Sequence, residues 1–388
     1  MDRYTVGEKI GEGSFGQVYF AVKHSTNEKR AIKRLKGAFA WEKVVPMREL
    51  QSLMQLTHHA NIVQLHEVHL VRGVVHFVFE YVPNGSLHDL MMLRAKAEQG
   101  PLEEIDVRAI VQQVLQGLEH LHRHGLMHRD IKPENLLLAG TVVKVADFSM
   151  ARGVENMSPL TSYVSTRWYR APEVLLASPD YDQAVDIFAT GCILAELLSL
   201  EPLFPGRSEI DQLQLIFALM GQPTSRTWKE GFRLLQRLGV IVDGASTAKA
   251  SISPRQGLVQ HLPSVSAAAV DFTFAVITLN PRDRLTASEA LRHPFLKPLL
   301  RQPILVNTTT STPARSKASS GPTAVTITPF QRPSMTDVDT PERLTHTALP
   351  VGSAKRRKPT DASEMYISSA FEVQWRKSTH TIARLPET

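Results

Sequence analysis

The octapeptide His128-Arg129-Asp130-Ile131-Lys132-Pro133-Glu134-Asn135, followed by Asp147-Phe148-Ser149, is the most informative part of this sequence. An aspartate such as Asp130 can orient a hydroxyl group and accept its proton. Asn135 and Asp147 offer hard oxygen ligands to Mg²⁺ that bridges phosphate groups. Lys132, two residues after Asp130, can neutralise charge on a transferred phosphate. The combination is highly specific and predicts catalysis of phosphoryl transfer.

A glycine-rich segment near the N-terminus, Gly11-Glu12-Gly13-Ser14-Phe15-Gly16-Gln17-Val18, matches the pattern G-x-G-x-x-G-x-V. Glycines without side chains let backbone N–H groups approach phosphate oxygens. Alone the pattern is weak, because an ordinary glycine hairpin has it too. A dinucleotide-binding fold would need a helix after this loop, whereas Gln17 to Ala21 continues as a strand. We therefore predict a hairpin over phosphates.

Lys33, in the strand-like run Ala31-Ile32-Lys33, follows this hairpin and is placed to reach the same phosphates. Its ammonium group needs an acidic partner, and Glu49 is the best candidate. Taken singly, an exposed lysine and a solvated glutamate are the simpler interpretations. A second expected ion pair joins Glu173 to Arg284, as a buried structural contact.

Two regions of different periodicity indicate an α+β fold with two lobes. Residues up to Tyr81 are strand-rich, with one predicted helix after Pro46. After Pro83-Asn84-Gly85 the chain is mainly helical, with one helix opened by Pro101 and a very apolar one from Ala184 to Leu198. We predict one domain over residues 4–296, made of a small β-rich lobe (4–80), a hinge (80–83) and a larger helical lobe (84–296).

From about Leu299 onward the periodicity is lost, and Thr, Ser and Pro dominate. Residues 297–388 are therefore expected to form a disordered tail. Residues 299–388 hold twelve Lys+Arg and seven Asp+Glu, so most of the chain's net charge of +6 belongs to this tail. The cluster Lys355-Arg356-Arg357-Lys358 resembles a nuclear import signal, although a solvated charge run is an alternative. Because no aromatic residues are interleaved with these charges, the cluster is a weak signal for nucleic-acid binding.

Taken in this order, the motifs resemble the eukaryotic protein kinase family over Tyr4 to Leu296. The segment from Tyr163 to Glu173 is similar to the CMGC group, which contains mitogen-activated and cyclin-dependent kinases. Thr161-Ser162-Tyr163 and Trp41-Glu42 resemble the male-germ-cell-associated and intestinal-cell kinase branch. The resemblance implies a serine/threonine protein kinase that uses ATP and Mg²⁺.

The resemblance also assigns an adenine site. Phe79 would be the gatekeeper, Glu80 to Val82 the hinge, and the apolar sandwich around the ring would be formed by Ile10, Val18, Ala31 and Leu137. From the residues alone, these apolar side chains could equally be core.

Regulation by two phosphates, at Thr161 and Tyr163, is a further expectation, because each phosphate would need guanidinium partners. Arg48, Arg129 and Arg152 would converge on phosphorylated Thr161. Arg167 and Arg170 are placed for phosphorylated Tyr163. The resemblance also implies that Arg170 and the region of Val164 shape a pocket that favours proline after the target residue.

Three positions depart from the family pattern: Phe15, Ser149 and Phe188. Ser149 replaces the glycine expected after Asp147-Phe148, which motivates the alternative of a catalytically weak kinase-fold scaffold. Lys33, Asp130 and Asp147 argue against that alternative.

The expected partners are an upstream activating kinase and protein substrates with Ser/Thr-Pro sites. Thr312-Pro313, Thr328-Pro329 and Thr340-Pro341 in the tail are autophosphorylation candidates. We expect a monomer without sequence-specific nucleic-acid binding. We also expect no membrane segments, since no apolar run is long enough to cross a bilayer. The expected location is the cytoplasm, with the nucleus and, by resemblance, the cilium or flagellum as further candidates.

Overall fold

The computed structural model describes residues 1–13, 16–56, 58–153, 167–239, 253–297 and 365–368. The chain divides into two units, Met1–Asn307 with Glu364–Thr388, and Thr308–Ser363. All the described residues belong to the first unit. Among them, no helix combines the length and the apolar character that a membrane crossing needs.

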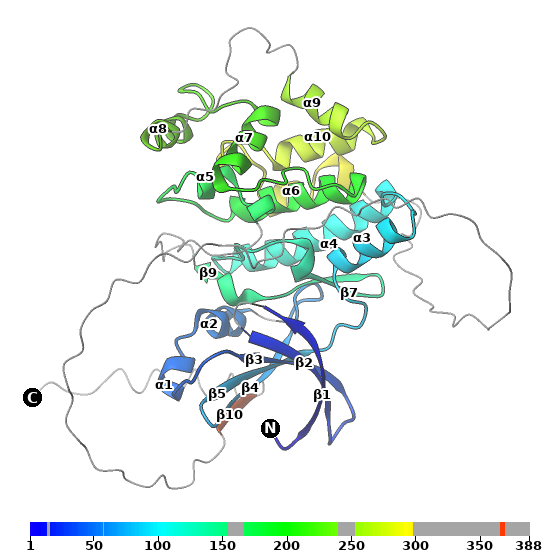
Figure 1. Cartoon of the computed structure of the whole chain (residues 1–388), viewed down its shortest axis with the longest axis vertical. Coiled ribbons are helices and arrows are strands. Elements are labelled where there is room, and N and C mark those ends of the chain that lie inside the picture. Colours follow the sequence, from blue (N-terminus) through cyan, green and yellow to red (C-terminus); the bar gives the residue numbers. More distant parts are fainter. Residues whose placement is uncertain (14–15, 57, 154–166, 240–252, 298–364, 369–388) are drawn as a thin grey trace, which may run out of the picture. The chain divides into compact units, whose positions relative to one another are not determined.

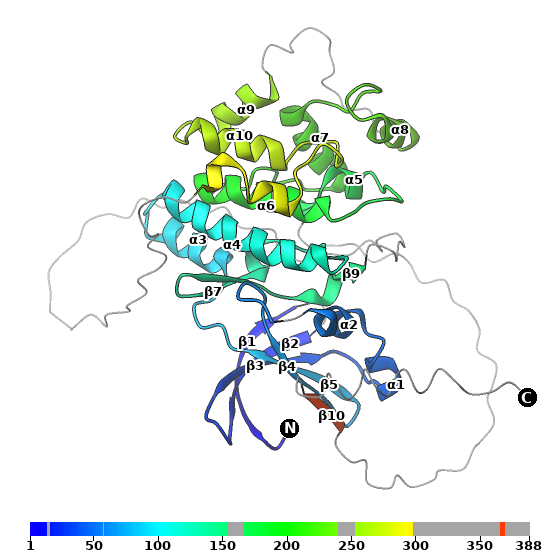
Figure 2. The same ribbon diagram turned by 180° about the vertical axis from the view of Figure 1, so that it is seen from behind.

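The N-terminal part is a twisted antiparallel sheet with two helices beside it (Figures 1 and 2). Its strands are β1 (Tyr4–Glu12), β2 (Gly16–Lys23), β3 (Lys29–Leu35), β4 (Leu65–Val71), β5 (Val74–Glu80) and β10 (Met365–Ser368), in the spatial order β1-β2-β3-β5-β4-β10. The helices are α1 (Trp41–Val44) and α2 (Arg48–Gln55). The predicted strand-rich region up to Tyr81 and the predicted helix after Pro46, which is α2, are confirmed, whereas α1 and β10 were not predicted from the sequence. Both missed elements have four residues, which is too short for a periodic pattern.

The C-terminal part is mainly helical and surrounds one large apolar core. Its helices are α3 (Leu87–Lys96), α4 (Glu104–Arg123), α5 (Pro172–Leu175), α6 (Ala184–Ser199), α7 (Glu209–Met220), α8 (Lys229–Arg237), α9 (Pro254–His261), α10 (Ala267–Val276) and α11 (Ala287–Ala290). Short strands and 3₁₀ turns complete it: β6 (Leu126–Met127), η1 (Pro133–Asn135), β7 (Leu136–Ala139), β8 (Val142–Val145), η2 (Phe148–Met150), β9 (Arg152–Gly153), η3 (Arg167–Tyr169) and η4 (Pro294–Leu296).

Helices α4 and α6 show why the sequence folds in this way. In α4 the buried side chains Val107, Ile110, Val111, Val114, Leu115, Leu118 and Leu121 recur at helical spacing along one face. In α6 almost every residue is buried, which explains its continuous apolar sequence. The sequence predicts that the first of these helices begins at Pro101. The structure begins it at Glu104, so that prediction was three residues early.

The predicted α+β fold class, with a β-rich lobe and a helical lobe, is confirmed. The buried pair Glu173–Arg284 is also confirmed. Two Arg284 N–H groups donate to the two Glu173 carboxylate oxygens over 2.7 and 3.1 Å, and both side chains are essentially inaccessible to solvent. The Arg284 guanidinium also lies 5.1 Å from the ring centroid of Phe188, one of the three unusual residues. The Glu173–Arg284 pair joins α5 to the segment before α11.

Candidate active site

The catalytic candidates lie in the loop between β6 and β7. Asp130 accepts a hydrogen bond from Lys132 Nζ at 2.7 Å and another from Asn135 Nδ2 at 3.0 Å. Asn135 Nδ2 also donates to the backbone oxygen of Asp130 over 2.8 Å. The loop therefore brings these three predicted residues together, with the carboxylate oriented by two neighbours and only 15% exposed.

Lys33 of β3 forms ion pairs with two further acidic candidates, Glu49 and Asp147. Its ammonium group donates to Glu49 Oε1 on α2 at 2.7 Å and to Asp147 Oδ1 at 2.8 Å. The predicted Glu49 contact is confirmed, while the Asp147 contact was not anticipated. Burial opposes a charged ammonium, but Glu49 and Asp147 outweigh it and raise the pKa of Lys33 above its ordinary value.

Asp147 remains ionised in this arrangement. Burial alone would raise its pKa, but Lys33 and a hydrogen bond from Ser149 lower the pKa to about 2. Its side chain is 37% exposed, so the carboxylate is accessible to solvent. Because Ala146 N donates to Asn135 O at 2.9 Å, the backbones carrying Asn135 and Asp147 lie side by side.

This pair of residues fits a divalent cation that is shared with phosphates. The Asn135 amide uses its N–H group on Asp130, which leaves its carbonyl oxygen for a cation. Among the described residues no cluster of three His, Cys, Asp or Glu side chains could hold a metal alone. A hard cation held by one or two protein oxygens, with substrate phosphates completing the shell, matches this donor set.

The glycine-rich segment forms the predicted hairpin between β1 and β2. Glu12 lies opposite Gln17 and Gly11 opposite Val18, and Gly13 N donates to Gly16 O at 2.9 Å. A Cβ atom on Gly16 would lie 2.3 Å from the Arg34 carbonyl oxygen in β3, so this glycine is required for strand packing. A Cβ atom on Gly13 would meet nothing within 4 Å. Ser14 and Phe15 lie outside the described residues.

The apolar residues expected around adenine are all partly exposed: Ile10, Val18, Ala31, Phe79 and Leu137. Their neighbours Ile32, Val78, Leu136 and Leu138 are buried. This contrast favours a cleft lining over a closed core, the choice that the sequence left open.

The hinge segment offers a free backbone donor. Glu80 Oε1 accepts from Gln64 N and Lys144 Nζ, and the Glu80 N–H donates to Gln64 O. The Val82 N–H, by contrast, has no hydrogen-bond acceptor within the described residues.

Arg48, Arg129 and Arg152 converge from α2, the catalytic loop and β9. Burial lowers the pKa of Arg129, with the positive charges of Arg152 and Arg48 as further causes, since the three guanidinium groups repel one another. Arg129 also lies 5.6 Å from the ring centroid of Tyr181. The predicted phosphosites Thr161 and Tyr163 lie outside the described residues, so their contacts to these arginines stay predictions.

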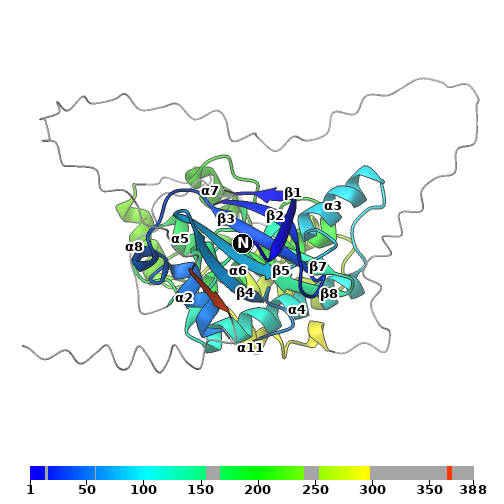
Figure 3. The same ribbon diagram turned by 90° about the horizontal axis from the view of Figure 1, so that it is seen from below.

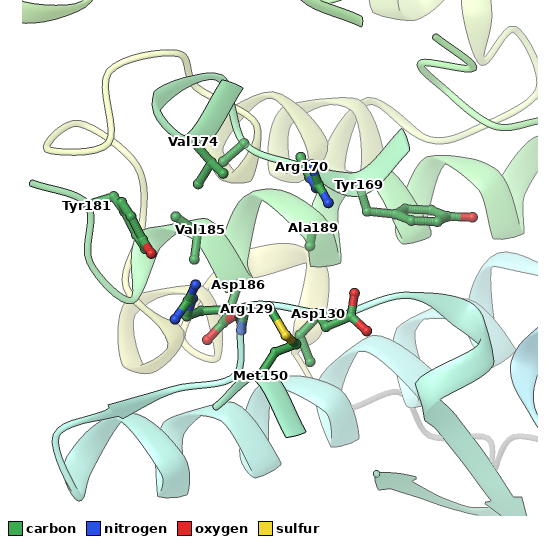
Figure 4. A pocket seen from close by; sticks show the side chains of 12 residues that line it. Arg129, Asp130, Met150, Tyr169, Arg170, Val174, Tyr181, Val185, Asp186 and Ala189 are labelled. Atoms are coloured by element: carbon green, nitrogen blue, oxygen red, sulfur yellow. Dashed lines mark hydrogen bonds between the residues drawn. The ribbon is translucent and has the colours of Figure 1, made fainter. Parts of the chain in front are cut away.

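Arg167 and Arg170 lie close to each other. Arg167 Nη1 donates to Arg207 O over 3.0 Å, and Arg170 Nη1 contacts Glu209 Oε1 at 3.4 Å. Burial lowers the pKa of Arg170, and among its electrostatic neighbours are Glu209, Arg167 and Asp130. Figure 4 shows Arg170 lining one pocket together with Asp130 and Arg129, whose side chains point in opposite directions.

Asp186 is a positioning residue that sequence analysis missed. This buried carboxylate on α6 accepts hydrogen bonds from the backbone N–H groups of His128 and Arg129, both at 2.8 Å, and contacts His122 Nε2 at 3.0 Å. It holds the catalytic loop at Arg129, which has a left-handed φ of 71°. The available signal was an aspartate within the very apolar segment Ala184–Leu198.

Ser149 fits its position without backbone strain. The left-handed residue of this motif is Asp147, with φ 60°, while Ser149 lies within the 3₁₀ turn η2 and donates its N–H to Asp147 Oδ1. The conformational freedom expected of a glycine is therefore not needed at Ser149 in this state. The replacement of glycine by Ser149 therefore gives no structural reason for a catalytically weak scaffold.

The comparisons with known proteins agree with this geometry. The model of the protein kinase domain matches residues 4–296. Cyclin-dependent kinase F-3 of Oryza sativa subsp. japonica is 42% identical, over 76% of this chain and 65% of its own length. The serine/threonine-protein kinases ICK of Rattus norvegicus and MAK of Mus musculus are 41% and 40% identical, over 76% of this chain and 45% and 46% of their lengths. The chain thus spans about half to two thirds of the length of these curated relatives, and it belongs to the protein kinase family.

Proposed function

We propose that this chain is an active serine/threonine protein kinase that transfers the γ-phosphoryl group of ATP, with Mg²⁺, to hydroxyl groups of proteins. The observation that carries the proposal is the assembled set of Lys33 between Glu49 and Asp147, and of Asp130 between Lys132 and Asn135. In protein kinases an ion pair between such a lysine and a helix glutamate accompanies the active arrangement.

The chain's own residues have separate tasks in this transfer. Asp130 orients the substrate hydroxyl and accepts its proton as the oxygen forms a bond to the γ-phosphorus. The bond from this phosphorus to the bridging oxygen breaks, and ADP leaves. Lys132 neutralises charge on the transferred group, and Lys33 holds the phosphates. Mg²⁺, when held by Asn135 and Asp147, would offset the negative charge that the phosphates carry.

The finer substrate preference is proline directly after the target Ser or Thr. Arg170 supports it, because this partly buried guanidinium lines the same pocket as Asp130. The preference extends to Thr-Pro pairs of the tail as autophosphorylation candidates. A peptide library in which alanine is accepted as readily as proline at that position would contradict the preference.

Activation by phosphorylation at Thr161 and Tyr163, by an upstream kinase, completes the proposal. The cluster Arg48, Arg129 and Arg152 supports it, since three repelling guanidinium groups gain stability from an anion. Thr161→Ala should leave low basal activity. Full activity of Thr161→Ala/Tyr163→Phe, expressed without an upstream kinase, would contradict the switch. We further propose that the protein acts as a monomer in the cytoplasm, with the nucleus or the cilium as further locations to test by fractionation.

The decisive experiment measures transfer of ³²P from ATP to a generic basic protein. Asp130→Asn should reduce turnover by roughly 10²–10⁴-fold, the range of a general base, while thermal unfolding stays close to that of the unchanged protein. The exposed Asp180→Asn is a matched control and should leave turnover unchanged. Retention of wild-type turnover by Asp130→Asn would remove the assignment.

A further inference from the structure

Strand β10 comes from the far end of the chain and forms the edge of the N-terminal sheet. Met365–Ser368 pairs antiparallel with β4, with Met365 opposite Leu70 and Ser368 opposite Glu67. Figure 3 shows β10 alongside β4. The kinase-domain match ends at residue 296, so this strand lies outside the region that the family model describes.

Strand β4 is covered on both faces, which leaves its outer edge as its open side. On one face Val68 is 2% exposed and belongs to an apolar cluster with Leu50 and Phe77. On the other face Glu67 and His69 are buried, and Glu67 accepts hydrogen bonds from Arg3 and Lys23, each over 3.2 Å. Every second residue of a strand directs its N–H and C=O groups to the same side, so half of these groups in β4 face away from β5. An unpaired edge of this kind is a template for another strand.

The same β4 segment supports the helix of the active site. Val68 of β4 packs in one cluster with Leu50 of α2. Leu50 is adjacent to Glu49, which pairs with Lys33. Whatever orders β4 therefore also supports the position of the Glu49 carboxylate.

We propose that Met365–Ser368 is an intramolecular docking strand, which caps the β4 edge and stabilises the β4–α2 assembly from outside the kinase domain. The occupant is this chain's own tail, because the pairing joins two segments of one compact unit. Residues 297–364 connect the domain to the strand covalently, so docking is not diluted as it would be for a separate partner. Tyr366 and Ile367 have high intrinsic preference for strands and interrupt an otherwise polar stretch.

The test uses residue-resolved hydrogen exchange of the full chain and of the variant Tyr366→Pro/Ile367→Pro. Proline has no N–H group, and of two adjacent residues one must direct its N–H toward β4, so the pair of prolines breaks the ladder whichever residue donates. Asp361→Pro/Ala362→Pro is the matched control, with two prolines before the strand. A synthetic peptide of residues 363–370 is then added in excess to the first variant.

The expected result is a roughly tenfold loss of protection, the effect of one or two ladder hydrogen bonds, at alternate amides of residues 65–71. Amides of β2 and the control variant should not change, and the added peptide should restore protection. Equal β4 protection in the full chain and the first variant would overturn the proposal. So would protection that depends on protein concentration, because the strand would then come from a second copy.

Discussion

Removal of the Asp186 carboxylate tests whether this residue positions the catalytic loop. Asp186→Ala leaves two backbone N–H groups without their acceptor, that of the buried His128 and that of the partly buried Arg129. Each unsatisfied group costs about 1–3 kcal/mol, which gives roughly 2–6 kcal/mol in all. Since domains are stable by only about 5–15 kcal/mol, urea unfolding should show a much lower midpoint.

The conservative change Asp186→Asn should have an intermediate effect. An amide offers one acceptor oxygen, so one of the two N–H groups would face an NH₂ group. We expect roughly half the loss of stability, together with a lower kcat and an almost unchanged KM for ATP, because the adenine site is untouched. The exposed Asp180→Asn is the control. Wild-type stability and turnover of Asp186→Ala would refute the assignment of Asp186 as the residue that positions the loop.

The pH dependence of unfolding gives a second check on the same residue. Burial would raise the pKa of Asp186, but hydrogen bonds from His122 and the loop outweigh it and lower the pKa. A folded pKa below the unfolded value of about 3.9 contributes stability above that pH. The contribution is lost as the pH falls through the folded pKa. Asp186→Asn should therefore lose less stability than the unchanged protein below about pH 4.

Three other changes test the remaining contacts. Lys33→Met should lower phosphoryl transfer by roughly 10²–10³-fold, as expected when a positioned charge is lost, with the domain still folded by circular dichroism. Ser149→Gly should change turnover by less than about tenfold, or roughly 1.4 kcal/mol in the barrier, because Ser149 is unstrained. A parent protein that is inactive until Ser149 is replaced by glycine would favour the scaffold alternative. Glu173→Leu should cost about 3–5 kcal/mol in urea unfolding by leaving the buried Arg284 guanidinium without its counter-charge. Because Arg284 also donates to the backbone oxygens of Thr278, Ala184 and Leu279, Glu173→Leu/Arg284→Met should recover only part of this loss; an unchanged unfolding midpoint of Glu173→Leu would contradict the pair.

Much of the active site follows from the sequence because its parts are local. Asp130, Lys132 and Asn135 lie within six consecutive residues, so one loop carries all three. The glycine hairpin and the two-lobed pattern are similarly local, since they depend on turn residues and periodicity. The helix that carries Glu49 and the strand of Lys33 are also predicted from the sequence, which makes their pairing a reasonable expectation.

Other features depend on residues that meet only after folding. The second partner of Lys33, Asp147, is 114 positions away, and no spacing rule connects the two residues. In the sequence, Asp186 is only a polar residue within an apolar helix. The folded structure shows that it accepts hydrogen bonds from the backbone N–H groups of His128 and Arg129, which need an acceptor. Strand β10 is too short to show a period, and its partner is an open sheet edge that exists only in the folded domain. Local chemistry is therefore determined by the sequence, whereas tertiary structure decides which distant groups satisfy one another's charges and hydrogen bonds.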